Sequence, residues 1–86
     1  MKAHLRGKVW DVVVVRNGPG VPYGLCDPPD KPGKQIRIRE GQKGRELADT
    51  VIHEALHACL WDLDDDAVHE IAHDLARLLD RMGLLK

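Results

Sequence analysis

Phenylalanine is absent from this sequence of 86 residues, and aromatic residues make up only 3% of it. The hydrophobic core must therefore be built from valine, isoleucine, leucine and alanine, and such a core is thin. The length suffices for one small domain, which we assign to residues 1–86. A bound metal would help to stabilise a domain of this size.

The sequence also lacks an excess of either charge and any long apolar run. Lysine and arginine total 13 against 14 for aspartate and glutamate, so the net charge is −1. This balance gives no electrostatic reason to expect binding to nucleic acid or to an anionic membrane. Apolar runs such as Val12 to Val15 are far too short to span a bilayer, and the N-terminal residues lack an export signal. We therefore expect a cytoplasmic protein.

Cysteine is scarce as well, with only Cys26 and Cys59 present. Two cysteines do not make the disulfide framework of a small secreted domain. We predict two free thiols in a reducing compartment, with Cys59 packed into a helix interface.

The first half of the chain predicts β-strands. Residues 8–16 are rich in β-branched side chains and end at the turn-forming NGPG, which predicts a strand that is central or covered on both faces. Residues 21–25 predict a short second strand, weakened by Pro22 and Gly24. The loop that follows holds three prolines.

A third strand is predicted at residues 35–40, where apolar and charged residues alternate. Ile36 and Ile38 face one side, and Arg37 and Arg39 face the other. The charged outer side suits a strand at the edge of the sheet.

From residue 45 onward the apolar spacing becomes helical. One helix is predicted over residues 45–61, then the acidic turn DLDDD with an aspartate as N-cap, then a second amphipathic helix with Gly83 at its C-terminus. Its apolar face comprises Val68, Ile71, Ala72, Leu75, Leu78, Leu79 and Met82. The expected fold is therefore α+β: a small antiparallel or mixed sheet of about three strands, then two antiparallel helices.

The first predicted helix contains HEALH, in which His53 and His57 are one helical turn apart. This spacing puts both imidazoles on one face, at a separation that suits a single zinc ion. Glu54 lies about 100° further round the helix, so it is no third ligand but can take a proton from a water on the metal. The pattern also arises by chance on helices. Here the small apolar neighbours favour a metal site, because buried imidazoles need a polar partner.

The segment VIHEALHACLW, with DDAVHEIAHDLARLLDRMG after a short acidic turn, resembles the core of the zincin metallopeptidases. It is most similar to the small gluzincin-like peptidases common in phage and prophage genomes, over residues 35 to 82. The resemblance implies a zinc-dependent peptide hydrolase with one Zn²⁺ per chain, in the cytoplasm of a bacterial or phage-infected host cell.

The resemblance also implies a third zinc ligand on the second helix. Gluzincins have a glutamate there, at the start of a pattern E-x-x-A-D-x-F-A. Laying Ile71 and Ala72 on the final F-A places Asp65 at the ligand position. The chain departs from the family at this point, because aspartate is one methylene shorter than glutamate.

Hairpin geometry gives other choices for the third ligand. If the turn is centred at position 63, position 70 faces His57, and His69, Glu70 and His73 come into range. We assign His73 to a solvated face. Asp65 is therefore the first choice, His69 the second and Glu70 the third.

The expected reaction is hydrolysis of a peptide bond by a zinc-activated water, with Glu54 as general base. The substrate would be a peptide or protein bound in extended form along the charged strand at residues 35–40. We expect a shallow groove, or one completed by a partner or by a second subunit in a homo-oligomer. The alternative is a non-catalytic, zinc-stabilised interaction domain of phage or bacterial origin. Four protein ligands would favour that alternative, and an open position for water would favour catalysis.

Overall fold

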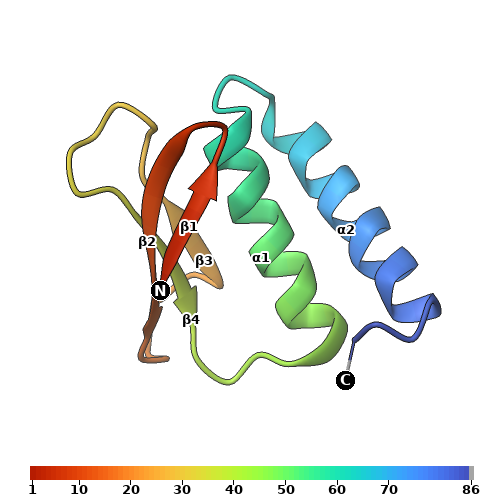
Figure 1. Cartoon of the computed structure of the whole chain (residues 1–86). Coiled ribbons are helices and arrows are strands. Elements are labelled where there is room, and N and C mark those ends of the chain that lie inside the picture. The colour runs from red at the N-terminus through yellow and green to blue at the C-terminus, as the bar shows by residue number, and fades with distance from the viewer. Residues whose placement is uncertain (86) are drawn as a thin grey trace.

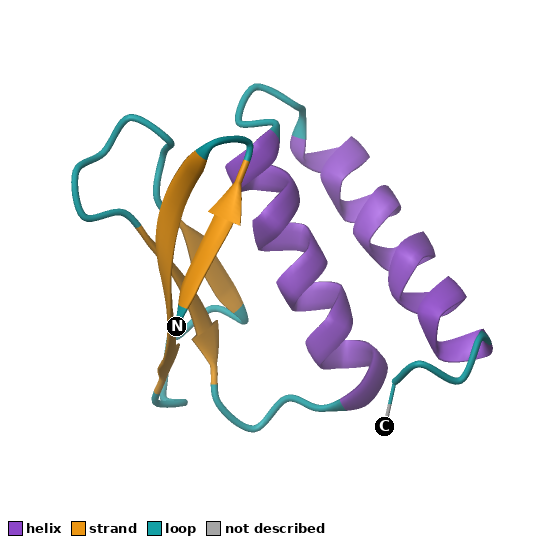
Figure 2. Cartoon of the chain, in the orientation of Figure 1, coloured by secondary structure: helices purple, strands orange, loops and turns teal. Residues whose placement is uncertain are grey.

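The computed structural model describes residues 1–85 as four strands and two helices in three layers (Figures 1 and 2). The sheet is the first layer, α1 covers one of its faces, and α2 packs on α1 without reaching any strand within the described residues. This arrangement confirms the predicted α+β class. The elements are β1 (Lys2–Leu5), β2 (Lys8–Val15), β3 (Gly24–Cys26), β4 (Gln35–Arg39), α1 (Gly44–Cys59) and α2 (Asp65–Arg81).

The strand order is β1-β2-β4-β3, with β2 and β4 parallel and the two outer pairs antiparallel. The sheet is therefore mixed and has one strand more than expected, because β1 is too short and polar to stand out in the sequence. The prediction that residues 35–40 form a sheet edge was wrong, since β4 lies between β2 and β3. Its charged side points to the uncovered face of the sheet, and β3 is the edge strand.

Only the side of the sheet that faces α1 carries the core. Trp10, Ile36, Ile38 and Ala58 form a buried cluster there. Strand β2 is interior within the sheet, but α1 covers only one of its faces. Val14 pairs with the buried Ile38 and so lies on the covered side, yet it remains 73% exposed, because that cover is incomplete toward the end of β2. The chain has no phenylalanine, and the large side chain that fills the space between sheet and helix is Trp10, which is fully buried.

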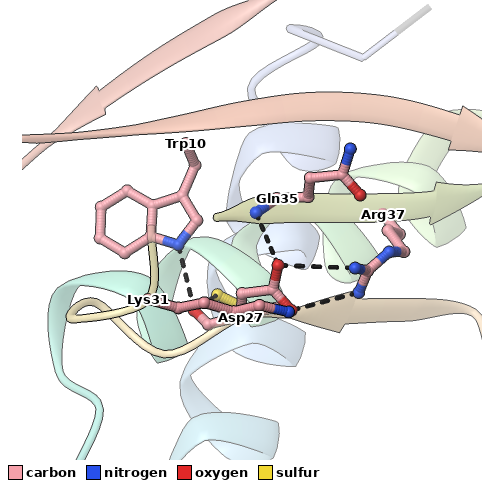
Figure 3. A network of polar contacts seen from close by, with 6 residues as sticks. Trp10, Asp27, Lys31, Gln35 and Arg37 are labelled. Atoms are coloured by element: carbon pink, nitrogen blue, oxygen red, sulfur yellow. Dashed lines mark hydrogen bonds and ion pairs between the residues drawn. The ribbon is translucent and has the colours of Figure 1, made fainter. Parts of the chain in front are cut away.

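Asp27, at the end of β3, ties the β3–β4 loop to the core (Figure 3). Its carboxylate accepts a hydrogen bond from the Gln35 backbone N–H at 2.8 Å and pairs with Arg37 at 3.3 Å and Lys31 at 3.5 Å. The backbone hydrogen bond, ahead of the two cations, holds the pKa of Asp27 below its usual range despite burial. The Asp27 carbonyl accepts a hydrogen bond from the Trp10 indole at 3.1 Å. The proline-rich loop is thereby anchored.

The two helices form an antiparallel hairpin with a short turn (Figure 1). The predicted aspartate N-cap of α2 is Asp64, whose side chain accepts a hydrogen bond from the Ala67 N–H at 3.0 Å. Gly83 follows the helix with a φ of +75°, the left-handed conformation that ends many helices. Within residues 1–85, neither helix has the length and apolarity to cross a membrane.

The predicted apolar face of α2 is only half buried. Val68, Ala72 and Ala76 pack against α1, and their small size lets the two helices approach closely. Because α1 is the one element that contacts α2 within residues 1–85, other residues of that face remain exposed: Ile71, Leu75, Leu78 and Met82.

Candidate metal centre

The helical geometry of α1 brings the two motif histidines together as predicted. The Nε2 atoms of His53 and His57 lie 3.2 Å apart. Two nitrogens bound tetrahedrally to one zinc, each about 2.0–2.1 Å from it, would be separated by about 3.3 Å. In the protein without metal this distance also allows a hydrogen bond between the two rings. The pair therefore fits zinc without any rearrangement.

The surroundings of the pair favour the neutral imidazole that a metal requires. The pKa of His53 is held below its usual value, first by burial and then by the neighbouring rings of His57 and His69. Asp49 and Asp65 act in the opposite direction. A neutral ring keeps a lone pair on one nitrogen, so His53 is ready to act as a ligand near neutral pH.

The register of the hairpin sets the partners of each residue on this face of α1. His57 Nε2 lies 3.6 Å from the Asp65 carboxylate, and one turn earlier the ring centroid of His53 lies 6.4 Å from that of His69. One turn earlier again, Asp49 contacts His73 Nδ1 at 3.3 Å. From each pair to the next, the residue on α1 moves one turn toward the N-terminus and the residue on α2 moves one turn toward the C-terminus. His73 contacts Asp49 but remains exposed, which agrees with its assignment to a solvated face.

This register differs from the one expected for a turn centred at position 63. Helix α1 ends at Cys59 rather than at 61, so the partner of His57 is Asp65 and not position 70. Asp64 caps α2, which leaves the Asp65 side chain exposed and facing His57. Glu70, the third choice for a ligand, does not line the hollows beside His53.

Within residues 1–85, no third side chain joins the histidine pair. Among the described residues, no three histidine, cysteine, aspartate or glutamate side chains converge on one point. Asp65 lies beside His57 and His69 lies beside His53, one on each histidine of the pair. Asp65 is 91% exposed in its side chain, so it can change rotamer at little cost. The preformed part of the centre is therefore the histidine pair.

Glu54 lies on the side of α1 that faces the sheet, where it is only 6% exposed. No side chain or backbone group within residues 1–85 forms a hydrogen bond or ion pair with its carboxylate. Burial raises its pKa to about 7, because the charged form loses its hydration. A carboxyl group with such a pKa exchanges protons readily at neutral pH, as a general base must.

Glu54 and His53 line two adjoining open hollows, of about 360 and 510 Å³, that also share Gly24 and His69. One hollow extends along α1 toward Asp49, and the other extends over His57, Trp61 and Asp65. The two hollows together form a groove between β3 and the helical hairpin. The histidine pair and the Glu54 carboxylate are both accessible from this groove.

The free edge of β3 borders this groove. Tyr23 and Asp27 use their backbone groups to bond to β4, at 2.9 Å each. Backbone groups of alternate residues point in opposite directions, so those of Gly24 and Cys26 point away from β4. The strand with a free edge at this groove is therefore β3, and the prediction that residues 35–40 offer a free edge was wrong.

Sequence reasoning missed two residues of the site. Asp49 lies four residues before His53, so the same i, i+4 spacing that identified the histidine pair could have included it. Gly24 lies in a segment that we read only as a weak strand, and its contact with α1 leaves no signal in the sequence.

Comparison with protein-family models, with curated proteins and with solved structures gives no significant match for this chain.

Proposed function

We propose that this protein is a zinc-dependent peptide hydrolase. His53 and His57 would hold the ion, with Asp65 as third ligand, and Glu54 would act as general base. The observation that carries the proposal is the pair of Nε2 atoms 3.2 Å apart, next to a buried carboxylate that lacks a hydrogen-bond partner within residues 1–85. Burying such a carboxylate costs stability, which favours a chemical role for it.

Zinc at this position would supply a Lewis acid that acidifies water and polarises an amide carbonyl. The chain itself supplies the proton transfers. Glu54 accepts a proton from the attacking water and returns it to the leaving amine.

The substrate of the proposed reaction is a peptide in extended form. The outward backbone groups of Gly24 and Cys26 can pair with it as an added strand, which fixes its direction across the groove. The groove is open along its length and has no second wall within residues 1–85. Short or unfolded substrates, or a partner that supplies the missing wall, fit this shape best.

A non-catalytic zinc-stabilised interaction domain is the second candidate. It is supported by the position of His69 beside His53, in addition to Asp65 beside His57. If both joined the histidine pair, four ligands would close the site and exclude water. Glu54 would then have no chemical role, and its raised pKa of about 7 would serve no reaction.

Hydrolysis and its response to Glu54→Gln separate the two candidates, and zinc content tests both. We expect close to one zinc per purified chain and hydrolysis of a fluorogenic peptide library. Glu54→Gln should keep the zinc and reduce the rate by about 10²–10⁴-fold. The matched control is Glu40→Gln, an exposed glutamate that lines neither hollow, which should keep both properties. Full zinc occupancy with no hydrolysis by the wild-type protein would favour the interaction domain. A purified protein that takes up no zinc would refute both.

A further inference from the structure

Gly24 begins the edge strand β3, where its own backbone conformation does not require glycine. Its φ lies outside the left-handed region that favours glycine, unlike the turn glycines such as Gly20 and Gly33. A glycine within a strand weakens it, because it has no side chain to pack and loses more conformational freedom on folding. The reason for glycine at this position must therefore lie in its surroundings.

Those surroundings leave no room for a side chain. A Cβ atom at position 24 would lie 2.8 Å from both Cγ and Oε2 of Glu54, and 3.0 Å from Cγ2 of Thr50. Carbon atoms in contact are normally about 3.5–4.0 Å apart. The space that a side chain at position 24 would fill is thus occupied by the proposed general base.

The strand cannot easily move back to make room. The Gln42 side chain donates hydrogen bonds to the carbonyls of Tyr23 and Arg39, at 3.0 and 2.8 Å, and also contacts the Thr50 hydroxyl. Gln42 thereby links the start of β3, the end of β4 and helix α1. A side chain at position 24 would have to displace Glu54 or break this link.

We propose that Gly24 is a positioning residue for Glu54. By lacking a Cβ atom it lets the edge strand lie against the carboxyl side chain, which is thereby held between β3 and α1 at the groove. This proposal rests on the proposed function for its catalytic meaning. Its geometric part concerns only Gly24 and Glu54 and can be tested without any activity.

The test is a double-mutant cycle on the unfolding equilibrium of the metal-free protein. Its four members are the wild type, Gly24→Ala, Glu54→Ala and the double variant. Glu54→Ala removes both atoms that lie 2.8 Å from the missing Cβ. We expect Gly24→Ala to raise the unfolding equilibrium constant at least about tenfold more in the wild type than in the Glu54→Ala background. Equal effects in the two backgrounds would overturn the proposal.

Gly18→Ala is the matched control. Gly18 also has no left-handed φ, and a Cβ atom there would meet only Val21 Cγ2, at an ordinary 3.8 Å. Its effect should be the same with and without Glu54. If Gly24→Ala alone does not fold, folding of the double variant would support the proposal, and failure of both to fold would overturn it.

Kinetics of the zinc-loaded protein provide the second readout. Gly24→Ala should bind zinc within about threefold of the wild-type affinity and leave KM little changed, while kcat falls toward that of Glu54→Gln. An unchanged kcat in a zinc-loaded, folded Gly24→Ala protein would refute the positioning role. If the wild type hydrolyses nothing, the proposed function fails, and the double-mutant cycle still decides whether Gly24 holds Glu54.

Discussion

Glu54→Gln should stabilise the metal-free protein, and by an amount that depends on pH. Burial raises the pKa of Glu54 from 4.5 to about 7 in the folded protein. The folded state therefore holds this proton more tightly than the unfolded chain does. Since the unfolded state releases the proton first, the free energy of unfolding falls as the pH rises from about 4.5 to about 7. Glutamine is nearly isosteric and never ionises, so the variant escapes this loss.

The size of the effect follows from the difference between the two pKa values. A difference of about 2.5 in pKa corresponds to about 3 kcal/mol, the full loss above pH 7. Most of it arises between pH 5 and pH 8. We therefore expect the advantage of Glu54→Gln over the wild type to grow by about 2–3 kcal/mol across that interval.

Urea unfolding at pH 5 and pH 8, with a chelator present, measures the effect directly. Comparing variant and wild type at each pH cancels the titration of other groups, including His53 and Asp27, which both proteins share. Glu46→Gln, at an exposed position on the same helix, should change the free energy of unfolding by less than about 0.5 kcal/mol at either pH. An advantage of Glu54→Gln that is the same at both pH values would show that Glu54 is hydrated in the folded protein.

Three other predictions concern the third ligand, the loop anchor and the thiols. Asp65→Ala should weaken zinc binding at least about tenfold in a competition titration, and His69→Ala should leave it nearly unchanged; the reverse result would make His69 the ligand. Asp27→Ala leaves the Gln35 N–H without its acceptor, so urea unfolding at pH 7 should show a loss of about 1–3 kcal/mol. Burial, and then the charge of Glu54, raise the pKa of Cys26 to about 12. Iodoacetamide at pH 8 should therefore alkylate Cys26 at least about a hundredfold more slowly in the folded protein than in urea.

The parts of the fold that were predicted correctly depend on local spacing. The pairing of His53 with His57 follows from helical geometry alone, because residues four apart share a face whatever lies around them. The strand at residues 8–16 and the aspartate N-cap were also correct, since β-branched runs and capping chemistry act within a few residues. Both cysteines are free, as predicted.

Two of the errors concern contacts between elements. Arg37 and Arg39 alternate with buried isoleucines, a pattern that fits an edge strand and an interior strand with one uncovered face equally well. The two cases differ only in whether β3 pairs with β4 on its outer side. Because β3 is only three residues long, its sequence gives little sign of that pairing. The exposed half of the α2 face has the same origin, because no pattern within a helix states how many neighbours will cover it.

The choice of third ligand shows how a small local error at a helix end is doubled across a hairpin. We expected α1 to reach residue 61, but it ends at Cys59 and the turn begins there. In an antiparallel hairpin, moving the centre of the turn by two residues moves the partner of any residue by about four, which is one full turn of helix. The residue opposite His57 therefore changes from position 70 to Asp65, and His69 moves opposite His53.

The end of a helix is the feature that a sequence determines least, because the last turn lacks hydrogen-bond partners and depends on its cap. Leu60 ends α1 in a non-helical conformation with no glycine to mark it. The choice between an aspartate and a histidine as zinc ligand therefore depends on where one helix stops.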